Sequence, residues 1–129
     1  EHLKFYRNLD VCLDTFPYPG VTTSFEAIWM GVPVLTKKGN NFVSRCGESI
    51  NHNLGLEDFI ADNENDYISK AIILNKNKEK ISNIRISLRE KCLNSPLFDK
   101  QSFGKSFSSL MKDIWQKYEI KKNQLNIGD

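Results

Sequence analysis

The stretch from Asp10 to Pro33, DVCLDTFPYPGVTTSFEAIWMGVP, decides the fold of this chain. Its apolar start, VCL, is typical of a buried strand, and it ends in a loop rich in proline and glycine. The residues from Thr23 to Met30 then have the pattern of a helix, and Gly31 is placed to end it. The stretch therefore predicts a strand, a turn and a helix start, which is the basic unit of an α/β protein.

The start of this predicted helix is a candidate phosphate site. The first turn of a helix carries free backbone N–H groups and the positive end of the helix dipole, and it commonly binds phosphate when it follows a strand. The hydroxyls of Thr22 and Thr23 add hydrogen-bond donors. Glu26, one turn further on, can accept hydrogen bonds from the two hydroxyls of a ribose. The segment Gly20–Glu26 therefore suits a nucleoside diphosphate.

The same residues also fit a second interpretation. Thr23-x-x-Glu26, placed before an apolar run, matches a capping box, in which the two side chains close the helix start. The two interpretations are compatible, because Glu26 can cap the helix in the empty protein and turn to a ligand when one binds. The spacing alone leaves both open.

Strand and helix patterns alternate along the first half of the chain. The predicted strands are Val11–Thr15, Pro33–Lys37 and a short strand within Leu56–Ala61. The predicted helices are 2–9, Thr23–Met30, Phe42–Leu54, 62–74, Lys78–Leu93 and Gln101–Lys121. This alternation predicts a parallel sheet of the α/β class. The last helix is amphipathic, with apolar side chains at intervals of three and four that form one wide stripe.

The composition argues against several classes of function. A net charge of +2 argues against nucleic acid as the main partner. No apolar run approaches the length of a membrane helix. Three cysteines cannot all pair with one another, which favours reduced thiols and a cytoplasmic location. Because the cysteines and histidines form no ligand-like cluster, we predict no structural zinc site.

Several charged residues near the predicted strand ends have structural interpretations. Arg45 can face a pyrophosphate or pair with Glu48, and the pairing is the favoured interpretation. Lys37 and Lys38 flank the end of the second strand, at the edge where α/β sheets bind ligands. They can contact a ligand there, but solvated side chains are the favoured interpretation. The acidic residues of Asp62–Asp66 have part of the spacing of a calcium loop but lack its glycine and its last glutamate, so we interpret them as a helix start.

A longer stretch that includes these motifs resembles a known family. LDTFPYPGVTTSFEAIWMGVPVLT, followed by Ser44-Arg45 and Gly47, resembles the C-terminal catalytic lobe of the O-linked N-acetylglucosamine transferase family, including its SPINDLY-like bacterial members. The later SPLF and the aromatic last helix are similar to the same lobe, so the resemblance covers nearly the whole chain. It implies part of the Rossmann-like lobe of a B-type glycosyltransferase.

The resemblance also implies roles for individual residues. Thr22 and Thr23 match residues that hold the diphosphate of a UDP-sugar, and Gly20 precedes them in the same loop. Glu26 matches an acidic residue that binds the uridine ribose, although many members have Asp there. His2 matches a histidine that stacks on the uracil side of the nucleotide.

The resemblance implies transfer of N-acetylglucosamine from a UDP-sugar donor to Ser or Thr hydroxyls of an acceptor protein, without a metal or other cofactor. Residues 1–122 are expected to form the nucleotide-sugar-binding lobe, and 123–129 a polar tail. The chain begins without Met, so we expect a piece of a larger enzyme. The catalytic base is then expected on the missing N-terminal lobe, and helical repeats are possible upstream. The piece alone is expected to transfer no sugar.

Two alternatives to an enzyme remain open. Val21 stands where animal members of the family have histidine, which removes a possible phosphate donor and allows a non-catalytic nucleotide-binding or scaffold module. A signalling domain like a response regulator is a weaker alternative, because such domains need an acidic cluster and Asp14 stands nearly alone. In a piece of a two-lobed enzyme, the last helix lacks its partner lobe, so its bare apolar stripe favours self-association.

Overall fold

The computed structural model describes the backbone of residues 1–125 and the side chains of residues 1–122. The chain divides into two compact units, of which the first is Glu1–Phe98 and the second begins at Asp99. Of the predicted polar tail 123–129, the last helix includes residues up to Leu125, and residues 126–129 lie outside the described part.

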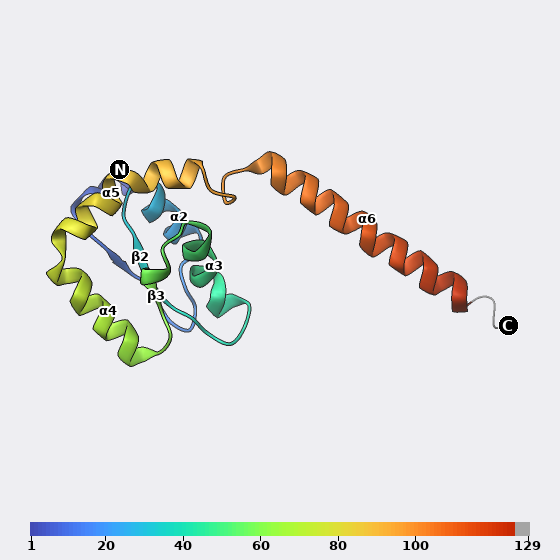
Figure 1. Cartoon of the computed structure of the whole chain (residues 1–129), viewed down its shortest axis with the longest axis horizontal. Coiled ribbons are helices and arrows are strands. Elements are labelled where there is room, and N and C mark those ends of the chain that lie inside the picture. The colour runs from blue at the N-terminus through green and yellow to red at the C-terminus, as the bar shows by residue number, and fades with distance from the viewer. Residues whose placement is uncertain (126–129) are drawn as a thin grey trace. The chain divides into compact units, whose positions relative to one another are not determined.

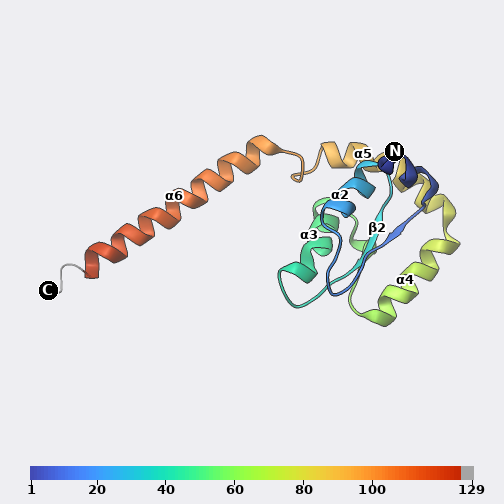
Figure 2. The same ribbon diagram turned by 180° about the vertical axis from the view of Figure 1, so that it is seen from behind.

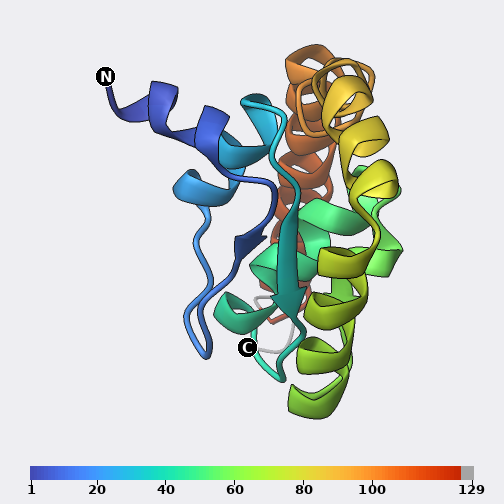
Figure 3. The same cartoon turned by 90° about the vertical axis from the view of Figure 1, so that its left-hand side faces the viewer.

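The first unit contains a three-stranded parallel sheet in the order β1-β2-β3. The strands are β1 (Cys12–Leu13), β2 (Val34–Lys37) and β3 (Ile60–Ala61). Cys12 pairs with Val34 and Thr36 with Ile60. Because the strands are parallel and in sequence order, their carboxyl ends meet at one edge of the sheet, where β1 leads into the loop before α2 (Figure 3).

Helices cover both faces of this sheet, as the parallel arrangement requires. Figures 1 and 2 show α2 and α3 on one side of β2 and α4 on the other. The helices and 3₁₀ turns of this unit are α1 (His2–Phe5), η1 (Tyr6–Asn8), α2 (Thr22–Trp29), η2 (Val43–Arg45), α3 (Cys46–Asn53), η3 (Glu57–Phe59), α4 (Glu64–Lys76) and α5 (Lys78–Leu93).

The core lies between the sheet and these helices. Ile28, Val32, Leu35 and Leu88 are completely buried, and apolar burial of this kind is the main force that holds the layers together. One buried polar side chain joins them as well: the amide of Asn51 in α3 donates hydrogen bonds to the backbone carbonyls of Val34 (2.9 Å) and Phe59 (3.1 Å). These bonds fix α3 against β2 and the turn before β3.

The predicted α/β class and parallel sheet are confirmed, with local differences in the bounds of the elements. The strand predicted over Val11–Thr15 is only Cys12–Leu13, and the helix predicted over 2–9 is divided into α1 and η1. The helix predicted over Phe42–Leu54 is divided into η2 and α3, because the Asn41 side chain accepts the Ser44 N–H at 2.9 Å and starts a local turn first. The strand predicted within Leu56–Ala61 is only two residues long, because Glu57–Phe59 form a 3₁₀ turn.

The second unit consists of the long helix α6 (Lys100–Leu125), which confirms the predicted last helix. Asp99 precedes it and accepts the Ser102 N–H at 3.0 Å, as a helix cap does. The apolar stripe of this helix is exposed, and its side chains keep between 47% and 68% of their accessible surface: Phe103, Phe107, Leu110, Met111, Ile114, Trp115 and Tyr118. No helix within residues 1–125 is long and apolar enough to cross a membrane.

Candidate functional site

Asp14 organises the loop between β1 and α2. One carboxylate oxygen accepts the Gly20 N–H at 2.8 Å, and the other accepts the Thr36 hydroxyl at 2.9 Å. Its backbone carbonyl accepts the hydroxyl of Tyr67 at 2.9 Å. These bonds bring Gly20 back to the end of β1 and tie the loop to both β2 and α4. In the sequence, Asp14 stands nearly alone as an acid at a predicted strand end, although an acid just before a Pro/Gly loop is a typical turn signal.

The start of α2 presents both threonines. Thr22 and Thr23 are exposed, and no side chain within the described residues caps this helix end. The Thr23 hydroxyl lies so close to Gly20 that a Cβ added there would be 2.2 Å from it. The first N–H groups of the helix and two hydroxyls are therefore available at one place, beside the carboxyl end of β1.

The predicted capping box is not formed. The helix begins at Thr22, with Val21 as the preceding residue, so Thr23 lies inside the first turn and not before it. Glu26 has other partners and does not turn back to the helix start. The capping interpretation of Thr23-x-x-Glu26 is therefore wrong for this structure, which leaves the ligand-binding interpretation of these residues as a proposal.

The structure brings His2 and Glu26 together from positions far apart in the sequence. His2 Nε2 lies 3.1 Å from Glu26 Oε2, and the His2 side chain is 70% exposed. Glu26 is partly buried, one turn after the threonines on the same helix. All five residues predicted for the site, His2, Gly20, Thr22, Thr23 and Glu26, thus belong to one surface region formed by α1, the loop and the start of α2.

Tyr6 is a neighbour of Glu26 that no sequence motif indicates. Its hydroxyl lies 3.4 Å from Glu26 Oε2 and 3.4 Å from the Thr23 carbonyl. Burial, together with the negative charge of Glu26, raises the pKa of the Tyr6 hydroxyl. The phenol therefore stays protonated and acts as a hydrogen-bond donor at neutral pH.

Two lysines at the end of β2 pair with acids of the next segment. Lys37 lies 3.2 Å from Glu64, and its ammonium sits over the ring of Phe16, 3.5 Å from the centroid. The Lys37 side chain is only 12% exposed, because the ring of Phe16 covers its ammonium group. The expectation that Lys37 is solvated is therefore wrong. Lys38 is more exposed and pairs with Asp62.

Arg45 forms the predicted pair with Glu48. Its Nε lies 2.8 Å from Glu48 Oε2 and its Nη2 3.3 Å from Oε1, a two-pronged contact. Hydrogen bonds from the Arg45 guanidinium hold the pKa of the Glu48 carboxyl below its usual range. The pair borders a cavity of 720 Å³ that also contacts Val21 and Phe25 at the start of α2. Arg45 thus has a structural partner beside the candidate site.

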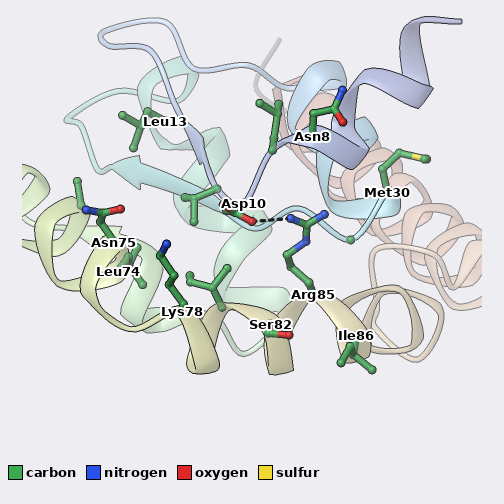
Figure 4. A pocket seen from close by; sticks show the side chains of 15 residues that line it. Asn8, Asp10, Leu13, Met30, Leu74, Asn75, Lys78, Ser82, Arg85 and Ile86 are labelled. Carbon is green, nitrogen blue, oxygen red and sulfur yellow. Dashed lines mark hydrogen bonds and ion pairs between the residues drawn. The ribbon is translucent and has the colours of Figure 1, made fainter.

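Another cavity, of 680 Å³, lies elsewhere in the first unit (Figure 4). It is lined by residues just before β1, by the end of α2 and by α4 and α5, and the Asp10–Arg85 ion pair of 2.9 Å lies at it. None of the five predicted site residues lines this cavity. A large cavity alone therefore does not mark the region that the sequence motifs indicate.

The three cysteines are free, and Cys92 is buried. Burial raises the pKa of the Cys92 thiol to about 11. Within the described residues, no group of three His, Cys, Asp or Glu side chains is arranged to hold a metal ion.

The structure is therefore a parallel α/β lobe that is followed by a long helix. The helix after its first strand has an open start. The sequence profile of glycosyl transferase family 41 matches residues 1–107. The chain belongs to this family, which confirms the resemblance and excludes a response regulator.

Relatives and a solved structure agree with this assignment. The chain is 39% identical over 118 residues to "Probable UDP-N-acetylglucosamine--peptide N-acetylglucosaminyltransferase SPINDLY" of Solanum lycopersicum, covering 92% of this chain and 13% of that protein. It is 29% identical over 119 residues to "UDP-N-acetylglucosamine--peptide N-acetylglucosaminyltransferase" of Caenorhabditis elegans, covering 92% of this chain and 10% of that protein. The structure "Thermobaculum terrenum O-GlcNAc transferase mutant - K341M" superposes with a TM-score of 0.83 at 33% identity, covering 90% of this chain and 22% of that one.

Proposed function

We propose that this chain is the UDP-sugar-binding part of a glycosyltransferase that transfers N-acetylglucosamine to Ser or Thr hydroxyls of proteins. The observation that carries the proposal is the contact between His2 and Glu26, 3.1 Å apart, next to two exposed threonines at an open helix start. The names of the relatives, which are peptide N-acetylglucosaminyltransferases, support the donor and the acceptor class.

The diphosphate of the donor is proposed to lie over Gly20, Thr22 and Thr23. The helix start supplies N–H groups and a partial positive charge, and the threonine hydroxyls supply further donors. Asp14 takes up the Gly20 N–H and fixes the loop backbone in this position. The positive helix end thus offsets the charge of the diphosphate leaving group, the role that a metal has in other transferases.

The nucleoside is proposed to lie toward α1. Glu26 accepts hydrogen bonds from the ribose hydroxyls, and the exposed ring of His2 is free to stack on the uracil. Because His2 bonds Glu26 in the ligand-free structure, ribose binding exchanges one partner of this carboxylate for another. No residue of this chain is assigned as the catalytic base, and we propose that another part of a longer enzyme supplies it. We propose a cytoplasmic location for this enzyme.

Two variants test the proposed division of the site. Glu26→Gln removes the charged acceptor of the ribose, so it should weaken UDP binding by about 1–3 kcal/mol and leave pyrophosphate binding nearly unchanged. Replacing Thr22 and Thr23 together by Val should weaken binding of pyrophosphate the most. Because a single lobe offers only part of the contacts of a two-lobed cleft, we expect dissociation constants of about 1 mM or weaker. NMR titration is suited to this range and measures both affinities.

The outcomes separate the proposal from its alternative. Equal loss of UDP and pyrophosphate in Glu26→Gln would mean that this residue supports the helix and does not bind ribose. A chain that binds neither ligand would be the non-catalytic scaffold that Val21 at the helix start allows.

A further inference from the structure

We propose that Tyr6 is a positioning residue that holds the Glu26 carboxylate in the orientation that receives the ribose. This inference rests on the proposed function and assigns a role to a residue outside the predicted nucleotide contacts. Tyr6 touches Glu26 and the first turn of α2 and is not itself proposed to contact the nucleotide.

Burial distinguishes Tyr6 from its neighbours. It keeps 7% of its accessible surface, whereas every other residue from Glu1 to Asn8 is exposed. Its ring belongs to the hydrophobic core of the first unit, so its hydroxyl has a fixed position below the surface. The N-terminal segment is therefore anchored next to α2 at this residue.

The hydroxyl of Tyr6 connects the two halves of the proposed site. It has one proton and lies 3.4 Å from each of two acceptors, the Thr23 carbonyl and Glu26 Oε2. The first acceptor belongs to the proposed diphosphate turn and the second to the proposed ribose contact. A protonated phenol shared between them fixes the carboxylate relative to the helix start.

The same carboxylate oxygen also faces His2, which packs its ring edge against Tyr6 with the ring centroids 5.7 Å apart. His2 is largely exposed and can leave Glu26 when a base or ribose arrives. Tyr6 is buried and stays in place. Tyr6 thus remains a partner of Glu26 both with and without ligand, which is the property a positioning residue needs.

The test is Tyr6→Phe in the full chain, with UDP and pyrophosphate titrated by NMR. We expect UDP affinity to fall about three- to tenfold, as for one lost hydrogen bond, and pyrophosphate affinity to stay within about twofold of wild type. In the ligand-free chain, the carboxyl ¹³C signal of Glu26 should move. In a Glu26→Gln background, Tyr6→Phe should cause no further loss of UDP affinity.

Two matched hydroxyl deletions serve as controls. Tyr118→Phe removes an exposed hydroxyl on α6 and should change neither affinity. Tyr67→Phe removes the bond to the Asp14 carbonyl, so it should loosen the diphosphate loop and weaken UDP and pyrophosphate alike. The contrast between Tyr6→Phe and Tyr67→Phe separates an effect on the ribose contact from an effect on the loop.

The outcomes are distinct. If wild type binds no UDP, the proposed function fails. If wild type binds UDP and Tyr6→Phe binds it equally well, the positioning role is overturned. Equal loss of both ligands in Tyr6→Phe, or the same loss of UDP affinity in the Glu26→Gln background, would overturn it as well, because Tyr6 would then act on the fold and not through Glu26. Should Tyr6→Phe fail to fold, Tyr6→Leu removes the hydroxyl, carries no hydrogen-bond donor and fits within the space of the ring, with the same expected results.

Discussion

Gly47→Ala is a sharp test of how the fold supports the candidate site. Gly47 lies in the first turn of α3, where the helix meets the end of β2 and the Asp14 side chain. A Cβ at this position would lie 2.3 Å from the Thr36 hydroxyl oxygen and 2.7 Å from Asp14 Oδ2. Thr36 is itself 1% exposed, so it has no space into which to move. The substitution therefore forces α3 away from the sheet.

The size of the effect follows from two losses and one gain. Overpacking of this kind costs about 1–3 kcal/mol. Breaking the hydrogen bond of 2.9 Å from Thr36 to the Asp14 carboxylate costs about 1.5–3 kcal/mol more. The better helix propensity of alanine returns about 1 kcal/mol at most. The net loss is about 1.5–5 kcal/mol, which lowers the melting temperature of a domain of this size by roughly 8–25 °C, at about 5 °C per kcal/mol.

Scanning calorimetry measures this change, and Gly104→Ala in α6 is the matched control. Apart from its chain neighbours and the nearby backbone of α6, no atom of the described residues lies within 4 Å of a Cβ at Gly104, so this variant should leave the transition of the first unit unchanged. UDP binding should be weakened in Gly47→Ala well below its melting temperature, because Asp14 also holds the Gly20 N–H. A Gly47→Ala protein that melts within about 2 °C of wild type would show that α3 does not approach Asp14 in this way.

Three further predictions concern other parts of the chain. Arg45→Gln should lower the melting temperature at neutral pH, because this arginine lowers the pKa of Glu48 in the folded state. The stabilisation is present above the ordinary glutamate pKa and is lost as the pH falls through the lowered pKa, so the melting temperatures of the two proteins should converge in acid. A constant difference in melting temperature down to pH 2 would contradict the prediction. In the folded protein at pH 8, Cys92 should resist iodoacetamide, because it is buried and the pKa of its thiol is raised to about 11. The partly exposed Cys46 should react. Mass spectrometry after brief labelling measures both, and equal labelling of the two cysteines would count against the prediction. The exposed apolar stripe of α6 should make the chain self-associate with rising concentration, and Trp115→Glu should reduce this in sedimentation velocity; a wild-type chain that stays monomeric would contradict the prediction.

Much of the fold was predictable because the deciding signals are local. The apolar run before the Pro/Gly loop predicts β1, and the periodic apolar residues predict α5, whose observed bounds, Lys78–Leu93, are the predicted ones. The five proposed site residues also come from a local motif and a family resemblance. Only His2 needed the fold to bring it to Glu26, 24 positions away in the sequence.

The signals that were missed depend on distant partners. The role of Asp14 arises from Gly20, Thr36 and Tyr67, which lie 6, 22 and 53 positions away, and no local pattern reports such bonds. Tyr6 lies in the predicted helix 2–9, and nothing in the local sequence indicates that its hydroxyl contacts Glu26, 20 positions away. The capping box failed for a different reason, because α2 begins two residues earlier than its spacing requires.

The most direct test of the central claim is a ¹⁵N chemical-shift map of the full chain during UDP addition. The account predicts that the amide shifts centre on Gly20–Glu26, with His2 also perturbed. The largest changes should fall at the start of α2, where the helix end is open. Shifts confined to α6, or to residues around the Asp10–Arg85 ion pair, would contradict the account.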